Sequence, residues 1–162
     1  MTQAFGYSTE DKSLKRWAEI RSRRTVVKNF LIMHLCKFLP DTEWKNSIYR
    51  KTGMKIGKNV SLFGSNFDIF FPELIEIGDG SVVGNKTAIL THEFLPNQWR
   101  KGPIKIGKNV TIGTMTVVLP GVTIGDNATV AAYSLVNKNV EPDTMVGGVP
   151  VKVIKVKNRK RK

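Results

Sequence analysis

The amino-acid sequence predicts an all-β solenoid that follows an N-terminal helical segment. Aliphatic residues recur at every sixth position over six consecutive repeats: Ile106, Ile112, Val118, Ile124, Val130 and Val136. The next position is small or turn-forming in most repeats, as at Gly107 and Gly125. A period of six is neither helical nor a simple strand alternation, and it suits coils in which each hexapeptide makes one short strand and one corner.

The repeat also predicts how the coils stack. The aliphatic side chains should point inward and pack on the equivalent residues of the next coil, because one coil cannot bury its core alone. Blocks in the same register begin at Ile56-Gly57 and Ile77-Gly78. Counted modulo six, three residues are inserted between these two blocks, and five more precede Ile106. We therefore expect the β-helix over residues 54–153, with an inserted loop at 95–103. An ordinary β-sandwich would need this spacing to arise by accident.

Residues 1–53 are predicted to be a helical segment. Six residues recur at helical spacing and end before Pro40: Val27, Phe30, Leu31, His34, Leu35 and Phe38. Their apolar face is expected to cover the open end of the solenoid as a helical cap, since that end would otherwise expose unpaired backbone. The same face is rimmed by basic residues and could instead lie on an anionic membrane. We expect His34 and Cys36 to be packed within this segment.

The formal net charge of +13 favours polyanionic partners, such as nucleic acid, anionic lipid or a phosphorylated small molecule. Basic residues gather near the N-terminus and in a predicted C-terminal tail over residues 154–162. Nucleic acid is disfavoured because no recognised motif accompanies the charge. The single cysteine fits a reducing compartment, and no apolar run approaches the ~20 residues needed to span a bilayer. We expect a cytoplasmic protein, free or peripheral at the inner membrane surface, with no metal site because ligand-spaced Cys and His residues are absent.

Four segments resemble the hexapeptide-repeat acyltransferases, in the maltose, galactoside and nodulation O-acetyltransferase branch. They are Ile89-Leu-Thr-His92, Ile106-Gly-Lys-Asn-Val-Thr-Ile-Gly-Thr114, Leu119-Pro-Gly-Val-Thr-Ile-Gly-Asp126 and Gly147-Gly-Val-Pro-Val-Lys-Val-Ile154. The resemblance covers about the last two thirds of the chain. It implies a left-handed parallel β-helix, transfer of an acyl group, most simply acetyl, from acetyl-CoA to a sugar hydroxyl, and a homotrimer with the donor held between adjacent solenoids. The chain departs from many relatives at Thr111, where they carry Trp, and in its basic N-terminal helix.

The resemblance implies that His92 is the catalytic general base. A neutral imidazole is suited to taking a hydroxyl proton near neutral pH. Without the resemblance, a surface histidine at a corner would be the simpler interpretation. The acceptor-binding candidates are Trp99 and Arg100 in the adjoining inserted loop, and Glu93, which follows His92 in the sequence. Glu93 could orient the imidazole, but neighbouring strand residues face opposite ways, so a backbone carbonyl is an equally good candidate.

The resemblance also implies a set of donor-binding residues. Thr114 matches a position whose hydroxyl contacts the thioester carbonyl, and Ala132 matches one whose backbone binds the pantetheine arm. Asn137 and Lys138 match a corner near the nucleotide end of the donor. Lys152 and Lys155 match basic positions that would meet the donor phosphates, and Pro150 would fix the bend after the last coil. The competing function is a basic membrane-surface or nucleic-acid-binding β-helix without catalysis.

Overall fold

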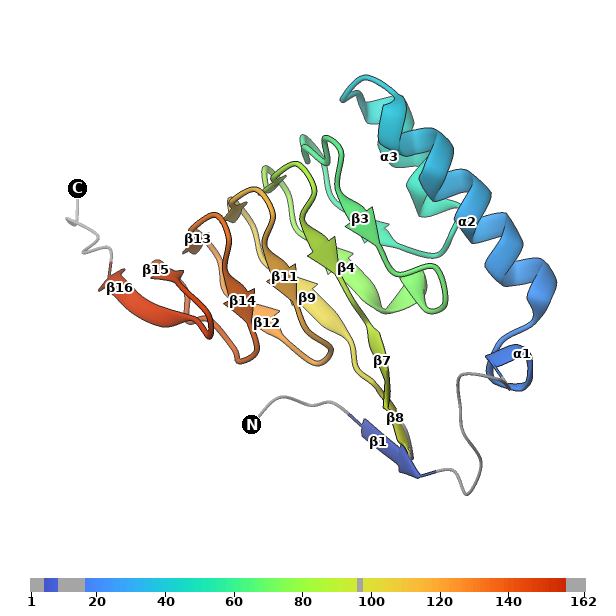
Figure 1. Ribbon diagram of the computed structural model, residues 1–162. Helices are drawn as coiled ribbons and strands as arrows, with labels where there is room; N and C mark the ends of the chain where they lie inside the picture. The colour runs from blue at the N-terminus through green and yellow to red at the C-terminus, as the bar shows by residue number, and fades with distance from the viewer. Residues whose placement is uncertain (1–4, 9–16, 96–97, 157–162) are drawn as a thin grey trace.

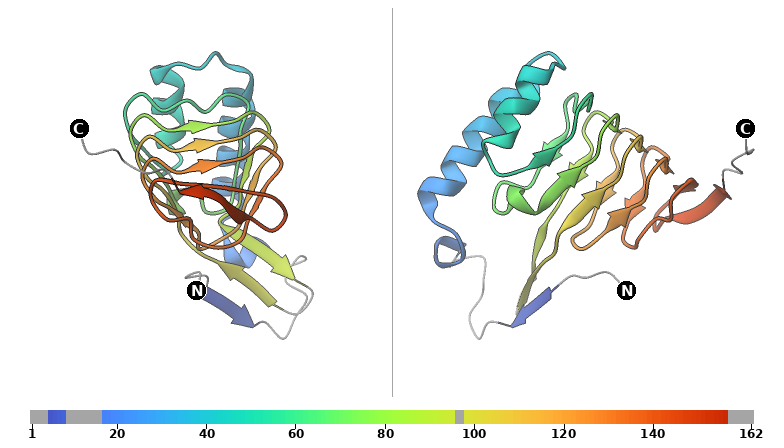
Figure 2. Two further views of the ribbon diagram at one scale, coloured as in Figure 1. Left: turned by 90° about the vertical axis from the view of Figure 1, so that its left-hand side faces the viewer. Right: turned by 180° about the vertical axis from the view of Figure 1, so that it is seen from behind.

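A computed structural model describes residues 5–8, 17–95 and 98–156, and its centre is a parallel β-helix with three faces (Figures 1 and 2). The first face contains β2 (Lys55–Ile56), β4 (Ile75–Ile77), β9 (Ile104–Ile106) and β12 (Thr123–Ile124). The second contains β5 (Val82–Val83), β10 (Thr111–Ile112), β13 (Thr129–Val130) and β15 (Thr144–Gly147), with β16 (Lys152–Val156) antiparallel at its edge. The third contains β3 (Asn66–Phe67), β6 (Ala88–Ile89), β11 (Val117–Val118) and β14 (Leu135–Val136).

The predicted aliphatic stack forms the core. All six repeat residues from Ile106 to Val136 are at most 2% exposed. Ile112 pairs with Val83 of the preceding coil and Val130 of the following one, and Ile124 pairs with Ile106. The six-residue period is therefore confirmed, because each repeat contributes one strand and each coil contains three of them.

Where glycine follows the aliphatic residue, it allows neighbouring coils to approach closely. A Cβ atom on Gly113 would lie 2.3 Å from the backbone nitrogen of Ala132, and one on Gly107 would lie 2.8 Å from that of Asp126. The left-handed turn itself falls two residues later, at Asn109 and Asn127, with φ angles of 53° and 58°. Asparagine tolerates this conformation better than most residues. The glycine thus serves coil stacking, and the asparagine makes the turn.

Two coils are longer than the regular length, and both have their extra residues after the third face. Paired residues of the first face are separated by 18 positions between Ile106 and Ile124, 21 between Ile56 and Ile77, and 29 between Ile77 and Ile106. The shorter excess contains the 3-10 helix η2 (Pro72–Leu74). The longer one contains the antiparallel hairpin β7 (His92–Leu95) and β8 (Gln98–Lys101). The excursion therefore includes His92 and begins before the predicted loop at 95–103, because residues 92–95 pair within the hairpin and not with another coil.

The chain ends also differ from their predicted extents. Within the segment expected to be helical, β1 (Phe5–Ser8) is a strand that pairs antiparallel with β8. At the other end, β16 continues to Val156, past the predicted start of the tail at residue 154, since it hydrogen-bonds to the edge strand β15. Residues 1–4, 9–16, 96–97 and 157–162, which include most of the tail, lie outside the described residues.

The helices α1 (Trp17–Ile20), α2 (Arg23–Phe38) and α3 (Glu43–Arg50) lie at the first-coil end of the solenoid (Figure 1). The α2 side chains that are buried against it are Val26, Asn29, Met33 and Cys36. The apolar stripe predicted to face the solenoid is instead exposed, from 47% at Phe30 to 76% at Phe38. Among the described residues, no helix is long and apolar enough to cross a membrane.

Polar contacts determine which side of α2 packs on the solenoid. The first coil has no preceding coil to bond its backbone carbonyls, and buried carbonyls need partners. The side-chain amide of Asn29 donates to Ile69 O (2.9 Å), that of Asn46 donates to Val60 O (2.7 Å), and Arg50 Nε donates to Ile56 O (2.9 Å). A purely apolar stripe could not make these bonds.

The two residues singled out within α2 differ from each other. His34 is exposed, contrary to the prediction, and its ring stacks on Phe30 with centroids 5.2 Å apart. It belongs to the same outward side as the exposed stripe. Cys36 is buried as predicted, and burial raises the pKa of its thiol.

Truncating the core aliphatics tests the register. Ile112→Ala and Ile124→Ala should each lower the free energy of unfolding by about 2–5 kcal/mol, because each removes buried methyl and methylene groups and leaves a cavity. Thr123→Ala, at an exposed position beside Ile124, is the matched control and should change little. Chemical denaturation followed by circular dichroism measures both. Unchanged stability in the two isoleucine variants would contradict this register.

Candidate active site

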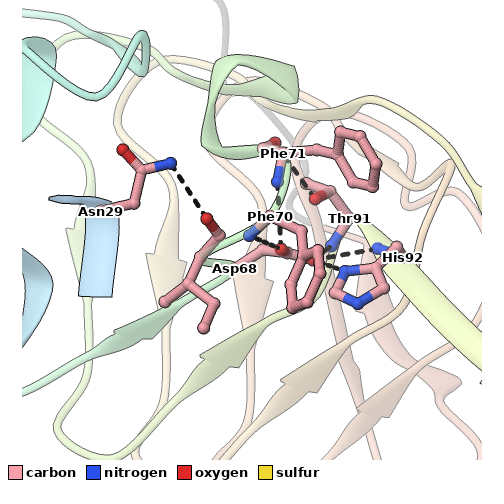
Figure 3. A network of polar contacts seen from close by, with 7 residues as sticks. Asn29, Asp68, Phe70, Phe71, Thr91 and His92 are labelled. Atoms are coloured by element: carbon pink, nitrogen blue, oxygen red, sulfur yellow. Dashed lines mark hydrogen bonds and ion pairs between the residues drawn. The ribbon is translucent and has the colours of Figure 1, made fainter. Parts of the chain in front are cut away.

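His92 stands at the corner where the third face returns to the first, at the start of β7 (Figure 3). Its side chain is 14% exposed, so the imidazole is largely removed from solvent but still reachable. Thr91, the preceding residue, is buried and its hydroxyl donates to Phe71 O (3.1 Å). The backbone that carries His92 is therefore anchored to the neighbouring coil.

The carboxylate of Asp68 holds this corner together. One oxygen accepts the backbone N–H groups of Phe70 (2.7 Å) and Phe71 (3.2 Å). The other accepts those of Thr91 (2.9 Å) and His92 (3.1 Å), and also makes a short contact with Nδ1 of the His92 ring (Figure 3). Asp68 thus connects the two inserted segments, one after β3 and one after β6.

The side chain of Asp68 is fully buried, yet its environment favours the ionised carboxylate. Burial acts to raise the pKa of the carboxyl, but hydrogen bonds from the His92 ring, Thr91 and Phe70 outweigh burial and lower it. An ionised carboxylate only accepts hydrogen bonds, so Nδ1 of His92 must be the donor. This fixes the tautomer of the neutral imidazole, in which Nε2 carries the lone pair. The site therefore contains an oriented base.

Aromatic rings surround the imidazole. The centroids of Phe70 and Phe94 each lie 4.8 Å from that of His92, and that of Phe71 lies 5.7 Å away. Trp17 of α1 packs edge-on against Phe70 at 5.8 Å, so the N-terminal helices reach the same corner. These rings restrict the imidazole and exclude water from most of its surface.

The acceptor-binding candidates separate onto the two sides of the hairpin. His92, Phe94 and Trp99 share one side, because Phe94 pairs with Trp99 across the strands. Trp99 is buried and stacks on Phe71, with centroids 5.9 Å apart and an interplanar angle of 10°. Glu93 and Arg100 pair with each other on the opposite side, in a short ion pair. The structure thus associates Trp99 with the histidine and places Glu93 and Arg100 away from it.

The donor-binding candidates lie at two different edges of the third face. Thr114 and Ala132 stand at the corner before that face, where Tyr133 N donates to Thr114 O (3.0 Å). Asn137 and Lys138 follow β14, at the corner shared with His92. Pro150, Lys152 and Lys155 are exposed in or beside the last hairpin. A face spans about 15 Å, so one chain does not bring His92 next to Thr114.

Asp68 is a candidate site residue that the sequence did not predict. It lies 24 positions before His92, in a different coil, and belongs to no motif. The sequence did contain a signal for this contact. The three-residue insertion and the longer insertion each come after the third hexapeptide of a coil, and the two coils are consecutive. The two insertions therefore leave the solenoid at the same corner. A carboxylate at the end of the strand before the first insertion is then a natural partner for a histidine in the second. Among the described residues, no group of three or more His, Cys, Asp or Glu side chains could hold a metal.

Proteins with similar sequences include acetyltransferases. The sequence model for the family described as bacterial transferase hexapeptide (six repeats) matches residues 103–138. The chain is 42% identical to the acetyltransferase-family protein YvoF of Bacillus subtilis, over 82% of this chain and 78% of that protein. It is 31% identical to the galactoside O-acetyltransferase of Escherichia coli, over 90% of this chain and 73% of that enzyme.

The fold has close counterparts among solved structures. A hexapeptide-repeat acetyltransferase of Vibrio cholerae, solved in complex with acetyl-coenzyme A, superimposes with a TM-score of 0.69 at 23% identity, covering 87% of this chain and 91% of that one. This likeness shows that the three-faced coil is a left-handed parallel β-helix, as the sequence predicted.

Replacing the buried carboxylate should cost stability in a pH-dependent way. Asp68→Asn should lower the free energy of unfolding at neutral pH by on the order of 3 kcal/mol, since backbone donors and the imidazole lose a charged acceptor. The pKa of Asp68 is lower in the folded chain than its unfolded value of about 3.9. Its contribution is therefore present above about pH 4 and is lost as pH falls through the folded pKa. The difference between variant and wild type should narrow in acid.

Denaturant titrations between neutral pH and about pH 3 measure this difference. Glu76→Gln removes the same charge from an exposed carboxyl and is the matched control, expected to leave stability unchanged. A difference between Asp68→Asn and wild type that stays constant across this range would show that the charge of Asp68 is not what stabilises the corner.

Proposed function

This chain belongs to the hexapeptide-repeat acetyltransferases, in the branch that includes the galactoside and maltose O-acetyltransferases, and on that basis we propose that it moves an acetyl group from acetyl-coenzyme A to a hydroxyl of a saccharide. The chain is thus an acetyltransferase, while the donor, the acceptor and the residues that act on them are our proposal. The observation that carries it is the His92–Asp68 pair at the corner where both insertions meet. In a β-helix without catalysis the Asp68 carboxylate would still hold the two inserted segments together, but nothing would require an accessible imidazole in a fixed tautomer beside it.

His92 acts as the general base. Its Nε2 takes the proton of the acceptor hydroxyl as that oxygen attacks the thioester carbonyl. The new carbon–oxygen bond forms, the carbon–sulfur bond breaks, and the proton on Nε2 passes to the sulfur of coenzyme A. Protons and electrons balance without a further reactant, so direct transfer in a ternary complex suffices.

Asp68 is a positioning residue in this reaction. Once Nε2 has gained the proton, the imidazolium lies beside the Asp68 carboxylate, which stabilises the positive charge. The same contact keeps Nε2 directed toward the acceptor before the reaction. Thr114 is the candidate donor to the developing oxyanion, because its side chain is exposed at the corner before the third face.

The site is composite and the assembly is a homotrimer. The geometry of one chain supports this proposal, because His92 and Thr114 lie at opposite edges of the third face. A donor bound at Thr114 and Ala132 of one chain would reach the imidazole of a neighbouring chain more readily than the imidazole of the same chain. Asn137, Lys138, Lys152 and Lys155 then extend the donor site toward the coenzyme A phosphates, and Pro150 shapes the bend beside it. Trp99 borders the acceptor through its stacking on Phe71.

The N-terminal helices cap the solenoid. The side-chain bonds from Asn29, Asn46 and Arg50 to carbonyls of the first coil support this role, because they replace the bonds that a preceding coil would make. Within α2, the contacts of the cap come from the buried side, and the exposed apolar side does not take part in these bonds.

Substitutions at His92 and Lys155 should affect turnover and donor binding separately. His92→Ala should lower kcat by about 10²–10⁴-fold with little change in donor affinity, since the imidazole acts on the acceptor hydroxyl. Lys155→Ala should do the reverse: the KM for acetyl-coenzyme A rises, more so at low salt, and kcat is retained at saturation. Steady-state kinetics over a saccharide panel measures both. Wild-type turnover in His92→Ala would remove this residue from the mechanism.

Composite sites predict complementation between two inactive chains. His92→Ala removes the base, and Ala132→Trp blocks the donor corner at an exposed position. A trimer that contains both variants has some interfaces with an intact His92 and an intact Ala132, so co-expression should restore activity that neither variant has alone. Sedimentation equilibrium should report a trimer. A fully active monomer, or no recovery in mixed trimers, would refute the composite site.

A further inference from the structure

The outward side of α2 is an extended apolar surface. Val27, Leu31 and Leu35 follow one another at intervals of one helical turn, and they are 53%, 53% and 68% exposed. Phe30 and Phe38 flank them at 47% and 76%, with the ring of His34 between the two. These residues define what we call the outward face of α2.

This face is separate from the one that holds the helix on the solenoid. The buried residues Val26, Asn29, Met33 and Cys36 lie on the other side of the helix. In Figures 1 and 2, α2 crosses the end of the solenoid, and within the described residues no other element covers it on the side away from the coils. Packing of the core therefore does not account for the outward face, because its apolar side chains are 47–76% exposed and none belongs to the buried core.

The charge of α2 indicates what the face contacts. The helix contains no Asp or Glu, and exposed Arg23, Arg24 and Lys28 border the apolar stripe near its N-terminal end. A helix with aliphatic and aromatic residues on one side and basic residues at the rim is suited to lie in the plane of an anionic bilayer surface. With 16 residues it is about 24 Å long, so it offers one continuous strip for shallow insertion.

We propose that the outward face of α2 docks the protein on anionic phospholipid bilayers. The aliphatic and aromatic side chains enter the boundary between headgroups and acyl chains, and the cations meet lipid phosphates. The solenoid axis then stands away from the membrane, since the helix lies across the end of the solenoid. The buried side of α2 keeps the helix fixed to the first coil while the outward face is occupied. This proposal does not depend on acetyl transfer.

Vesicle co-sedimentation of the full-length protein tests the proposal. Wild type should pellet with phosphatidylcholine vesicles that contain phosphatidylglycerol and should bind phosphatidylcholine alone weakly. Leu31→Gln with Leu35→Gln should lower the partition coefficient at least about tenfold, because two large side chains no longer favour the apolar phase. Val153→Gln with Val156→Gln, two similarly exposed residues at the opposite end of the solenoid, is the matched control and should stay within about twofold of wild type.

A second set of variants tests the basic residues that border the outward face. Neutralising Arg23, Arg24 and Lys28 with Gln should abolish the preference for phosphatidylglycerol, whereas neutralising the exposed Lys58, Lys86 and Lys105 removes equal charge and should preserve most of it. Acetyl transfer to a freely dissolved acceptor should be unchanged in the Leu31 and Leu35 variant, and His92→Ala should still bind vesicles. A failure of catalysis can thus be distinguished from a failure of docking.

Three results would overturn the proposal. The first is wild-type protein that does not bind the anionic vesicles, and the second is a Leu31 and Leu35 variant that binds them as well as wild type. The third comes from sedimentation without vesicles: if the same variant dissociates an assembly that wild type forms, a second copy of the chain covers the outward face and the membrane does not.

Discussion

The whole structure depends on one constraint, that each coil must return in register with the one before it. Backbone hydrogen bonds and the aliphatic stack both connect residues 18 positions apart in the regular coils, as Ile106 and Ile124 show. Extra residues cannot remain within such a coil without moving every inward side chain out of phase, so they leave it at a corner. Both insertions leave at the same corner in consecutive coils, and the candidate active site is formed where they meet.

That corner illustrates how a buried charge can be accommodated. A carboxylate without partners is costly in an apolar interior. Asp68 instead accepts four backbone N–H groups and the imidazole, drawn from both inserted segments. The regular coils need no such charge, because their backbones bond to one another. The carboxylate is thus the connection that the irregular segments require, and the orientation of His92 follows from it.

The sequence predicted the regular part of the molecule well and the irregular part less completely. A strict period of six gives the strands, the faces and the buried residues such as Ile112, because every repeat obeys the same packing rule. His92 was predicted as a site residue through resemblance, whereas Asp68 was not predicted, because its contact with His92 depends on which corner each insertion occupies. The side of α2 that packs on the solenoid was predicted wrongly: both sides are apolar, and the polar residue Asn29 makes the decisive contact. Thr114 and Ala132 lie at one edge of the third face and His92 at the other, and motif resemblance alone does not give this separation within a chain.

The pairing of β1 with β8 has a consequence for the order in which the molecule assembles. Coil-to-coil contacts close loops of about 18 residues, but Ser8 and Gln98 are 90 positions apart. The entropy of closing a flexible loop grows with the logarithm of its length, so this pairing costs about 1.4 kcal/mol more than a coil step before any contact is gained. The strand made first during synthesis is therefore expected to be among the last to find its place, after the coils have already stacked. The hairpin that begins with His92 acquires its third strand only at that final stage.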